Sequence, residues 1–285
     1  MGQPGSTTER AMPNIGRNNF TVLADYAAAT AKIPGARRCL AFGDSWFQYP
    51  PRPIDIEKQL ARAFKGTLFL NEAVPGRDSA QWKLSLPRVQ REIGTFRFDA
   101  IILSSGGNDV VGDELLEYVK TAAQAQSAGS TNWGPIPPEV LDHVRLELFE
   151  HALSYAIADF REIVQYRNMY SPGTIVFVHT YDYIYPSGDP FTLGPVTVGP
   201  WAKPALDAVG LTDPGRQRIV TSWLLDQFAA ALQAFASQNA NVRVVDSRGT
   251  LTSRRQWQNE IHPTRSGFAL IANACWVPAL TGILT

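Results

Sequence analysis

Strand-length runs of apolar residues alternate with longer amphipathic stretches along this chain, and this alternation limits the fold more than any other feature of the sequence. The runs contain Val, Ile, Leu and Phe without a strict apolar–polar alternation, which is typical of strands covered on both faces. They are Arg38–Phe42, Thr67–Leu70, Phe98–Ser104, Gly173–His179 and Val242–Asp246. The stretches predicted as helices are Ile54–Phe64, Ser79–Ile93, Pro138–Arg167, Arg216–Ser237 and Thr264–Leu280. This order predicts an α/β protein of three layers, α/β/α, with a central, mostly parallel five-stranded sheet.

Short polar blocks follow the first three predicted strands. They are Gly43–Ser45, Asn71–Gly76 and Gly106–Asp109. In open parallel sheets, ligands bind beyond the carboxyl ends of the strands, which is where these blocks lie. The sequence therefore predicts one site built from three neighbouring loops.

The residue types in these blocks are those that acyl transfer requires. Ser45 offers a hydroxyl nucleophile, and His262, near the C-terminus, offers a base that titrates close to neutrality. The backbone amides of Ser45 and Gly76 and the side-chain amide of Asn108 are donors for a developing oxyanion. Glycine suits position 76 because a Cβ would obstruct the approach of substrate oxygen to the amide.

In this order along the chain, the blocks and His262-Pro263 resemble the SGNH/GDSL hydrolases, whose four defining residues correspond to Ser45, Gly76, Asn108 and His262. The resemblance implies the flavodoxin-like fold of that family and a lipase-like serine esterase without a cofactor. It also implies an acyl-serine intermediate on Ser45. An acyltransferase on the same scaffold and a catalytically weakened binding protein are open alternatives.

The residue that would orient His262 departs from the family pattern. The family usually carries an aspartate three residues before its histidine, and here that position is Asn259. An amide oxygen can accept a hydrogen bond from the imidazole, but it cannot offset the charge of an imidazolium. Glu260 and Asp246 are the alternative acids.

The segment from Tyr181 to Pro204 is rich in aromatic residues and proline and follows the fourth predicted strand. A loop of this length inside a compact domain is usually a lid or a binding loop. The alternative is that its aromatic residues pack against one another as a small separate core. His179 ends the same strand, and Trp46 follows the nucleophile. The expected substrate-contacting residues are Trp46, His179, Tyr181, Tyr183 and Trp201.

The composition excludes several kinds of partner. The 26 basic and 26 acidic residues cancel, so we expect no nucleic-acid partner. No run approaches the ~20 apolar residues of a membrane span. No cluster of His, Cys, Asp and Glu has the spacing of metal ligands, so no metal is expected. The expected partner is a small-molecule or polymeric ester substrate.

The Gly/Pro/Thr-rich start of the chain predicts a partly disordered lead-in over residues 1–30, followed by a single catalytic domain over residues 31–285 with an insertion at about 181–204. The first residues lack the basic and apolar blocks of a secretory signal peptide. We therefore expect a cytoplasmic protein if the chain is complete, and a secreted form with a removed leader stays an open alternative.

Overall fold

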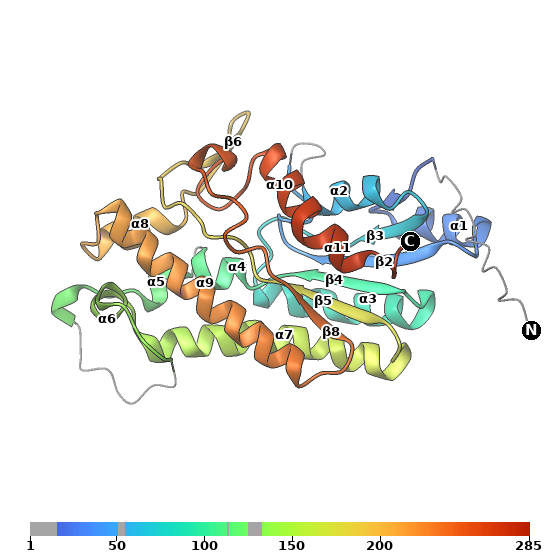
Figure 1. Ribbon diagram of the computed structural model, residues 1–285, viewed down its shortest axis with the longest axis horizontal. Coiled ribbons are helices and arrows are strands. Elements are labelled where there is room, and N and C mark those ends of the chain that lie inside the picture. Colours follow the sequence, from blue (N-terminus) through green and yellow to red (C-terminus); the bar gives the residue numbers. More distant parts are fainter. Residues whose placement is uncertain (1–15, 51–54, 113, 125–132) are drawn as a thin grey trace, which may run out of the picture.

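A six-stranded sheet forms the centre of the protein in a computed structural model that describes residues 16–50, 55–112, 114–124 and 133–285 (Figure 1). Its strands are β1 (Asn19–Phe20), β2 (Arg37–Gly43), β3 (Thr67–Asn71), β4 (Ala100–Ser104), β5 (Ile175–His179) and β8 (Val242–Val245). Their order is β1-β3-β2-β4-β5-β8, and every neighbouring pair is parallel. The five predicted strands are confirmed. The strand β1 was not predicted, because its two residues form no apolar run.

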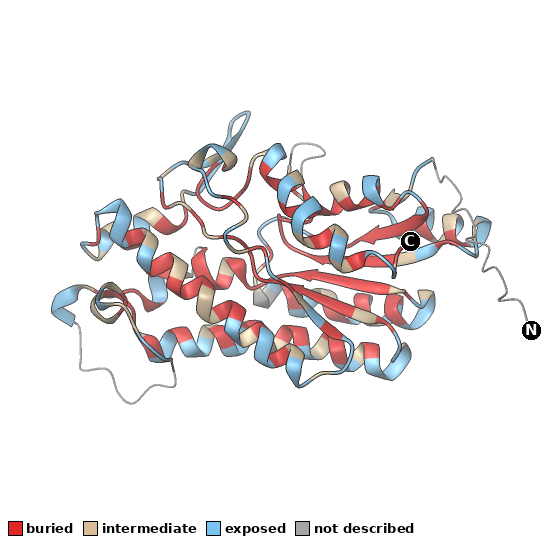
Figure 2. Cartoon of the chain, viewed as in Figure 1, coloured by how far each residue is buried: buried red, intermediate tan, exposed pale blue. Residues whose placement is uncertain are grey.

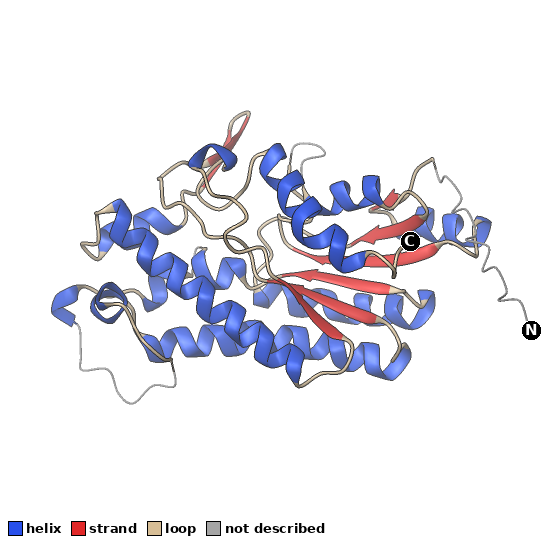
Figure 3. Ribbon diagram, in the orientation of Figure 1, coloured by secondary structure: helices blue, strands red, loops and turns tan. Residues whose placement is uncertain are grey.

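Helices cover both faces of the sheet and give the three layers expected from the sequence (Figure 3). They are α1 (Leu23–Lys32), α2 (Ile56–Ala63), α3 (Ser79–Phe96), α4 (Gly107–Val111), α5 (Leu115–Tyr118), α6 (Pro138–His143), α7 (Leu146–Tyr170), α8 (Ala202–Ala208), α9 (Pro214–Ser237), α10 (Arg265–Ile271) and α11 (Val277–Leu280), with the 3₁₀ turns η1 (Ala122–Gln124) and η2 (Arg254–Gln256) and the π-helical turn η3 (Ala272–Trp276). In Figure 1, α2 and α10 lie above the sheet, and α7 runs along below it.

Side-chain caps explain why several helices begin where they do. The carboxylates of Asp55, Asp78 and Asp213 accept hydrogen bonds from backbone amides in the first turns of α2, α3 and α9, at 2.8 to 2.9 Å. Thr264 caps α10 in the same way, through the amide three residues on, at 3.1 Å. Because Thr264 follows His262 by two residues, this cap also fixes the end of the loop that carries the histidine.

Two of the predicted helices are interrupted. The predicted helix Pro138–Arg167 divides into α6 and α7, because Val144 is extended and pairs with Val119 in an antiparallel bridge. The predicted helix Thr264–Leu280 contains the π-helical turn η3 just before Pro278, which has no N–H to donate. The break at Val144 has no glycine or proline beside it to signal it, whereas Pro278 follows η3 by two residues.

Figure 2 shows the sheet buried on both faces, beneath helices whose outer faces are exposed. Among the described residues, α9 is the one helix long and apolar enough, by length and composition, to cross a membrane. Half of its apolar window is buried inside the protein, including Leu224, Leu225 and Phe228. A core helix meets the same criterion, and packing on α7 and β8 accounts for the apolar residues of α9.

The insertion, residues 181–204, leaves the carboxyl end of β5. It runs without regular structure to a short antiparallel hairpin of β6 (Phe191–Leu193) and β7 (Val196–Val198), and then enters α8. The hairpin projects at the top of Figure 1. Residues 1–15 of the expected lead-in lie outside the described residues, and the part of the chain from Gly16 on contains β1 and α1.

Candidate active site

The loops after β2, β3 and β4 bring Ser45, Gly76 and Asn108 to one pocket. The strand β2 lies between β3 and β4, and the strands are parallel, so their carboxyl ends meet at the same edge. The chain turns to opposite sides of β2 at this point, and open α/β sheets bind ligands at such a switch point. The predicted meeting of the three blocks is therefore seen in the structure.

The turn that presents Ser45 is anchored on β4. A Cβ on Gly43 would lie 2.3 Å from the carbonyl oxygen of Ser104, so only glycine allows this approach, and the amide of Asp44 donates to that oxygen at 2.9 Å. The Asp44 carboxylate then accepts from the amide of Trp46 at 2.9 Å. Burial raises the pKa of Asp44 to about 6. These contacts hold the backbone on both sides of the serine.

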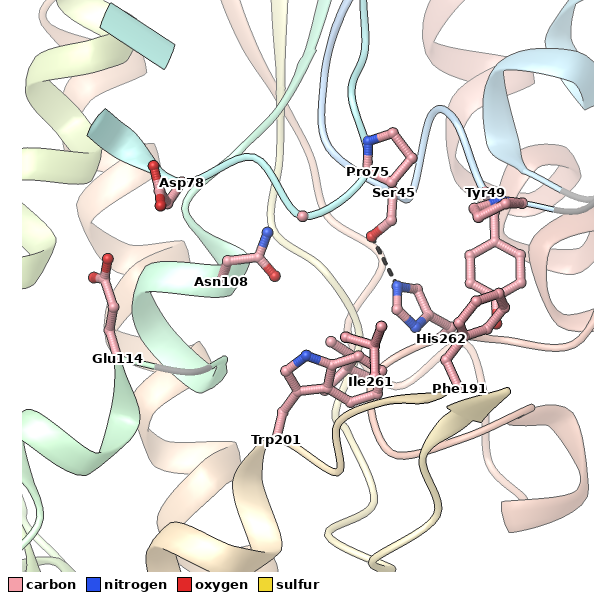
Figure 4. A pocket seen from close by; sticks show the side chains of 13 residues that line it. Ser45, Tyr49, Pro75, Asp78, Asn108, Glu114, Phe191, Trp201, Ile261 and His262 are labelled. Carbon is pink, nitrogen blue, oxygen red and sulfur yellow. Dashed lines mark hydrogen bonds between the residues drawn. The ribbon is translucent and has the colours of Figure 1, made fainter. Parts of the chain in front are cut away.

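Ser45, His262 and Asn259 form a continuous chain of contacts, of which Figure 4 shows the hydrogen bond between Ser45 and His262. His262 Nε2 lies 2.7 Å from Ser45 Oγ, and His262 Nδ1 lies 3.1 Å from Asn259 Oδ1. Ser45 and His262 line the pocket, whereas Asn259 is fully buried behind the histidine. The structure therefore brings together the three residues that were expected to act as nucleophile, base and orienting residue.

The hydrogen bonds of Asn259 decide which imidazole nitrogen carries the proton. Its Oδ1 also accepts from the backbone amides of His262, at 2.9 Å, and Ile261, at 3.2 Å, so the oxygen and not the nitrogen of the amide faces the histidine. His262 Nδ1 must then be the donor. This tautomer leaves Nε2 unprotonated and able to accept the Ser45 hydroxyl proton.

Burial lowers the pKa of His262 to about 3. No carboxylate among the described residues hydrogen-bonds to this imidazole, so nothing there opposes the cost of desolvating its charged form. The histidine is therefore neutral over the ordinary pH range, which is the protonation state that a general base needs.

The two alternative acids lie elsewhere. The carboxylate of Glu260 accepts four backbone amides of the insertion and of the first turn of α8. Asp246 accepts from Thr180 Oγ1 at 3.0 Å and pairs with Arg248 at 2.6 Å. Neither carboxylate contacts His262, so Asn259 alone of the three candidates touches the imidazole.

Ser45, Gly76 and Asn108, which line the pocket, each have a hydrogen-bond donor that is free to bind a ligand. Neither the Ser45 amide nor the Gly76 amide donates to an acceptor in the part of the chain that the structure describes. Asn108 Nδ2 donates to the carbonyl oxygen of Arg77 at 3.0 Å, which leaves its second hydrogen for a ligand. Gly76 has φ +72°, and no protein atom lies within 4 Å of an added Cβ, so backbone conformation and not a protein clash requires glycine here.

The pocket has a volume of about 270 Å³ and walls that are mainly apolar. Tyr49 and Phe191 lie on the His262 side, with ring centroids 5.5 Å apart, and Asp78 and Glu114 lie on the side beyond Asn108 (Figure 4). Burial beside other carboxylates raises the pKa of Glu114 to about 7. The lining residues are Ser45, Tyr49, Pro50, Pro75, Gly76, Asp78, Asn108, Glu114, Phe191, Val198, Trp201, Ile261 and His262.

Of the five expected substrate-contacting residues, Trp201 lines this pocket, and its ring meets that of His262 edge to face, with centroids 5.4 Å apart. Trp46 and Tyr181 border a void of about 10 Å³ behind Ser45, and the Tyr181 hydroxyl donates to the Asp44 carboxylate. The remaining two lie away from both spaces.

His179 is fully buried and its Nε2 lies 2.8 Å from Ser247 Oγ. Burial lowers the pKa of His179 to about 3. The hydroxyl of Tyr183 donates to Asp226 at 2.6 Å. Both residues therefore contribute to packing around the site, and neither faces the space beside Ser45.

Tyr49, Phe191 and Ile261 form pocket walls but were not among the five expected substrate-contacting residues. Their positions in the sequence indicated a place near the site. Tyr49 follows Ser45 by four residues, Phe191 lies in the insertion, and Ile261 precedes His262. Asp78 and Glu114 carried no such indication, because nothing in the sequence distinguishes a carboxylate at a pocket wall from one in solvent. Among the described residues, no group of three or more His, Cys, Asp and Glu side chains is arranged to hold a metal ion.

Residues 41–270 match the model of the GDSL-like lipase/acylhydrolase family. The chain belongs to this family. The match contains all four blocks, including Ser45 and His262, and it covers most of the chain. No curated protein sequence matches the chain significantly.

Solved structures share the fold at low sequence identity. An extracellular lipase from Streptomyces rimosus is 15% identical with a TM-score of 0.52, over 84% of this chain and 99% of that one. A lipase from a goat rumen metagenome is 13% identical with a TM-score of 0.52, over 88% of this chain and 100% of that one. At these identities the comparison establishes the α/β fold, and the chemistry rests on the site.

Proposed function

We propose that this GDSL-family protein hydrolyses a carboxylic ester through an acyl-serine intermediate. Ser45 Oγ attacks the ester carbonyl carbon while His262 Nε2 takes the hydroxyl proton, and the imidazolium then gives that proton to the departing alcohol. Water attacks the acyl-serine carbonyl with the same histidine as base, releasing the carboxylic acid and restoring the serine. The amides of Ser45 and Gly76 and the Asn108 side chain hold the oxyanion in both steps.

The observation that carries this proposal is the 2.7 Å contact between His262 Nε2 and Ser45 Oγ at the floor of an open pocket. A general base must lie within hydrogen-bond reach of the proton it removes, and this pair already does so. The unused amides of Ser45 and Gly76 lie at the same place. A protein that only binds esters needs neither feature.

Asn259 makes the site a serine–histidine pair oriented by a neutral amide. The amide selects the tautomer of His262 but gives no charge stabilisation to the imidazolium. The oxyanion donors therefore carry a larger share of the transition-state stabilisation than in a site with a triad aspartate. This division of roles accounts for an enzyme without a carboxylate at position 259.

The pocket walls support an ester with an apolar group. Tyr49, Phe191, Val198 and Trp201 surround the space beside His262, and such walls recover free energy by covering apolar substrate surface. The two solved structures described above are lipases by name, which agrees with this class of substrate.

Labelling with a fluorophosphonate probe tests the proposal. The wild-type protein should form one covalent adduct, and Ser45→Ala should abolish both labelling and ester hydrolysis. Ser247→Ala is the matched control, because Ser247 also contacts a histidine, His179, but is fully buried away from the pocket. Labelling that persists in Ser45→Ala contradicts the proposal, and product analysis with an added alcohol separates hydrolysis from acyl transfer.

A further inference from the structure

Glu260 has an unusual set of partners for a residue so close to the histidine. Its side chain is fully buried, and its two carboxylate oxygens accept four backbone N–H groups at 2.5 to 3.0 Å. No basic side chain pairs with it among the described residues. The four donors belong to Gly188, Trp201, Ala202 and Lys203.

These donors lie at both ends of the hairpin that overhangs the pocket. Gly188 precedes β6, and the other three residues follow β7 and begin α8. The main chain of Glu260 adds two further bonds to the insertion, because its carbonyl accepts from the Tyr185 amide at 3.2 Å and its amide donates to the Asp189 carbonyl at 3.4 Å. Glu260 thus binds both ends of the hairpin through one side chain, and Arg254 also contacts the insertion, through Asp189 and Ser187.

The same residue belongs to the loop that carries the proposed base. Asn259 and Ile261 flank it, and both contact or border His262. In the insertion, the ring of Trp201 packs against His262, with Phe191 nearby (Figure 4). Val198 also lines the pocket. Any shift of the insertion relative to the histidine loop therefore changes the shape of the pocket.

We propose that Glu260 is a positioning residue that fixes the insertion against the histidine loop and so determines which esters the pocket accepts by the size of their apolar group. This inference rests on the proposed ester hydrolysis. The preferred substrate is an ester whose acyl or alcohol chain is long enough to contact Trp201, Phe191 and Val198.

The four amides that donate to Glu260 explain why a carboxylate is needed at this position. Hydrogen bonds from amides to a buried carboxylate are stronger than those between neutral groups, and a carboxylate accepts at both oxygens. Glutamine has the same shape but only one accepting oxygen, so its NH₂ group would face backbone N–H groups. Glu260→Gln therefore loosens the insertion without removing volume from the core.

The test compares kcat/KM for para-nitrophenyl octanoate and para-nitrophenyl acetate. In Glu260→Gln we expect the octanoate-to-acetate ratio to fall about tenfold, mainly through KM for octanoate, which corresponds to about 1.4 kcal/mol. The control is Glu147→Gln, which makes the same change at an exposed position on α7, outside the insertion and the pocket, and it should leave the ratio unchanged. Glu260→Asp, which keeps the charge on a shorter side chain, replaces Glu260→Gln if circular dichroism shows that variant to be unfolded, with the same expected direction.

A double-mutant cycle with Trp201→Ala separates positioning from general loss of stability. If Glu260 acts through the wall, Trp201→Ala lowers the same ratio and the double variant lowers it little further. The acidic limb of the pH–rate profile should not move in Glu260→Gln, because the carboxylate does not contact His262.

The outcomes distinguish the two proposals. A wild-type protein that hydrolyses neither ester refutes the proposed function. A wild-type protein that hydrolyses both, with a ratio that stays fixed in the Glu260 variants, refutes the positioning role alone. An equal loss of kcat on both esters together with a shifted acidic limb also refutes it, because that pattern belongs to a triad acid.

Discussion

Replacing Asn259 by aspartate should raise the pH at which the enzyme loses activity. Asn259 Oδ1 lies 3.1 Å from His262 Nδ1, so a carboxylate at this position would directly face the imidazolium. An opposite charge at this range raises a histidine pKa by roughly 1–3 units. Burial holds the pKa of His262 at about 3 in the wild type. The acidic limb of the pH–rate profile should therefore move from about pH 3 to roughly pH 4–6, because the enzyme with a protonated, inactive His262 persists to higher pH.

The size of this shift follows from the charges. Two unit charges about 4 Å apart interact by about 4 kcal/mol at an effective dielectric constant of 20, which corresponds to about 3 pKa units. Desolvating the new carboxylate reduces this value, although the amides of Ile261 and His262 that already donate to Oδ1 would stabilise it. At neutral pH, kcat/KM should be preserved or raised, since the carboxylate stabilises the imidazolium that forms during attack.

The assay is kcat/KM on one small soluble ester as a function of pH. Gln238→Glu, which adds the same charge at an exposed site, should leave the limb in place. Asn259→Ala should cost less activity than His262→Ala. If the acidic limb of the pH–rate profile does not move in Asn259→Asp, residue 259 does not face the imidazole of the catalytic base. A loss on the order of 10⁴ on neutralising Glu260 or Asp246 would identify a triad acid that we have placed elsewhere.

Asn108→Ala should lower kcat by about 100- to 1,000-fold with a smaller change in KM, as expected for the loss of one oxyanion donor, and a loss confined to KM would show that the amide binds ground-state substrate. Trp201→Ala should change the preference between short- and long-chain esters, whereas Tyr183→Ala, which removes the bond to Asp226, should lower the melting temperature with little change in preference. His179→Gln should reduce the amount by which the free energy of unfolding falls when the pH is lowered. Burial lowers the pKa of His179 from 6.5 to about 3, so the unfolded chain binds this proton first as the pH falls, and melting temperatures at neutral and mildly acidic pH measure the effect.

The sequence predicted the parts of the fold that depend on apolar runs. Strands such as Ala100–Ser104 are buried along their whole length, so their composition reveals them. The strand Asn19–Phe20 depends on pairing with β3 across the chain, which no local pattern records. The break at Val144 has the same origin, because it is set by a bridge to Val119.

The candidate site was predictable to the extent that its residues follow strands. Ser45, Gly76 and Asn108 meet because parallel strands end at one edge, and His262 follows from its residue type near the end of the chain. The choice among Asn259, Glu260 and Asp246 was not predictable, because it depends on which side chain faces Nδ1. The hydrogen-bond partners of Glu260 depend on the path of the insertion, and the hydrophobic periodicity of the sequence does not predict that path.

The most direct test of the central claim is to trap the acyl group of an ester on the protein. The wild-type enzyme, quenched in acid during turnover of para-nitrophenyl octanoate, should show an octanoyl adduct by mass spectrometry on the peptide that contains Ser45, together with a burst of nitrophenol. An adduct on another residue, or hydrolysis with no adduct and an active Ser45→Ala variant, would contradict the acyl-serine mechanism.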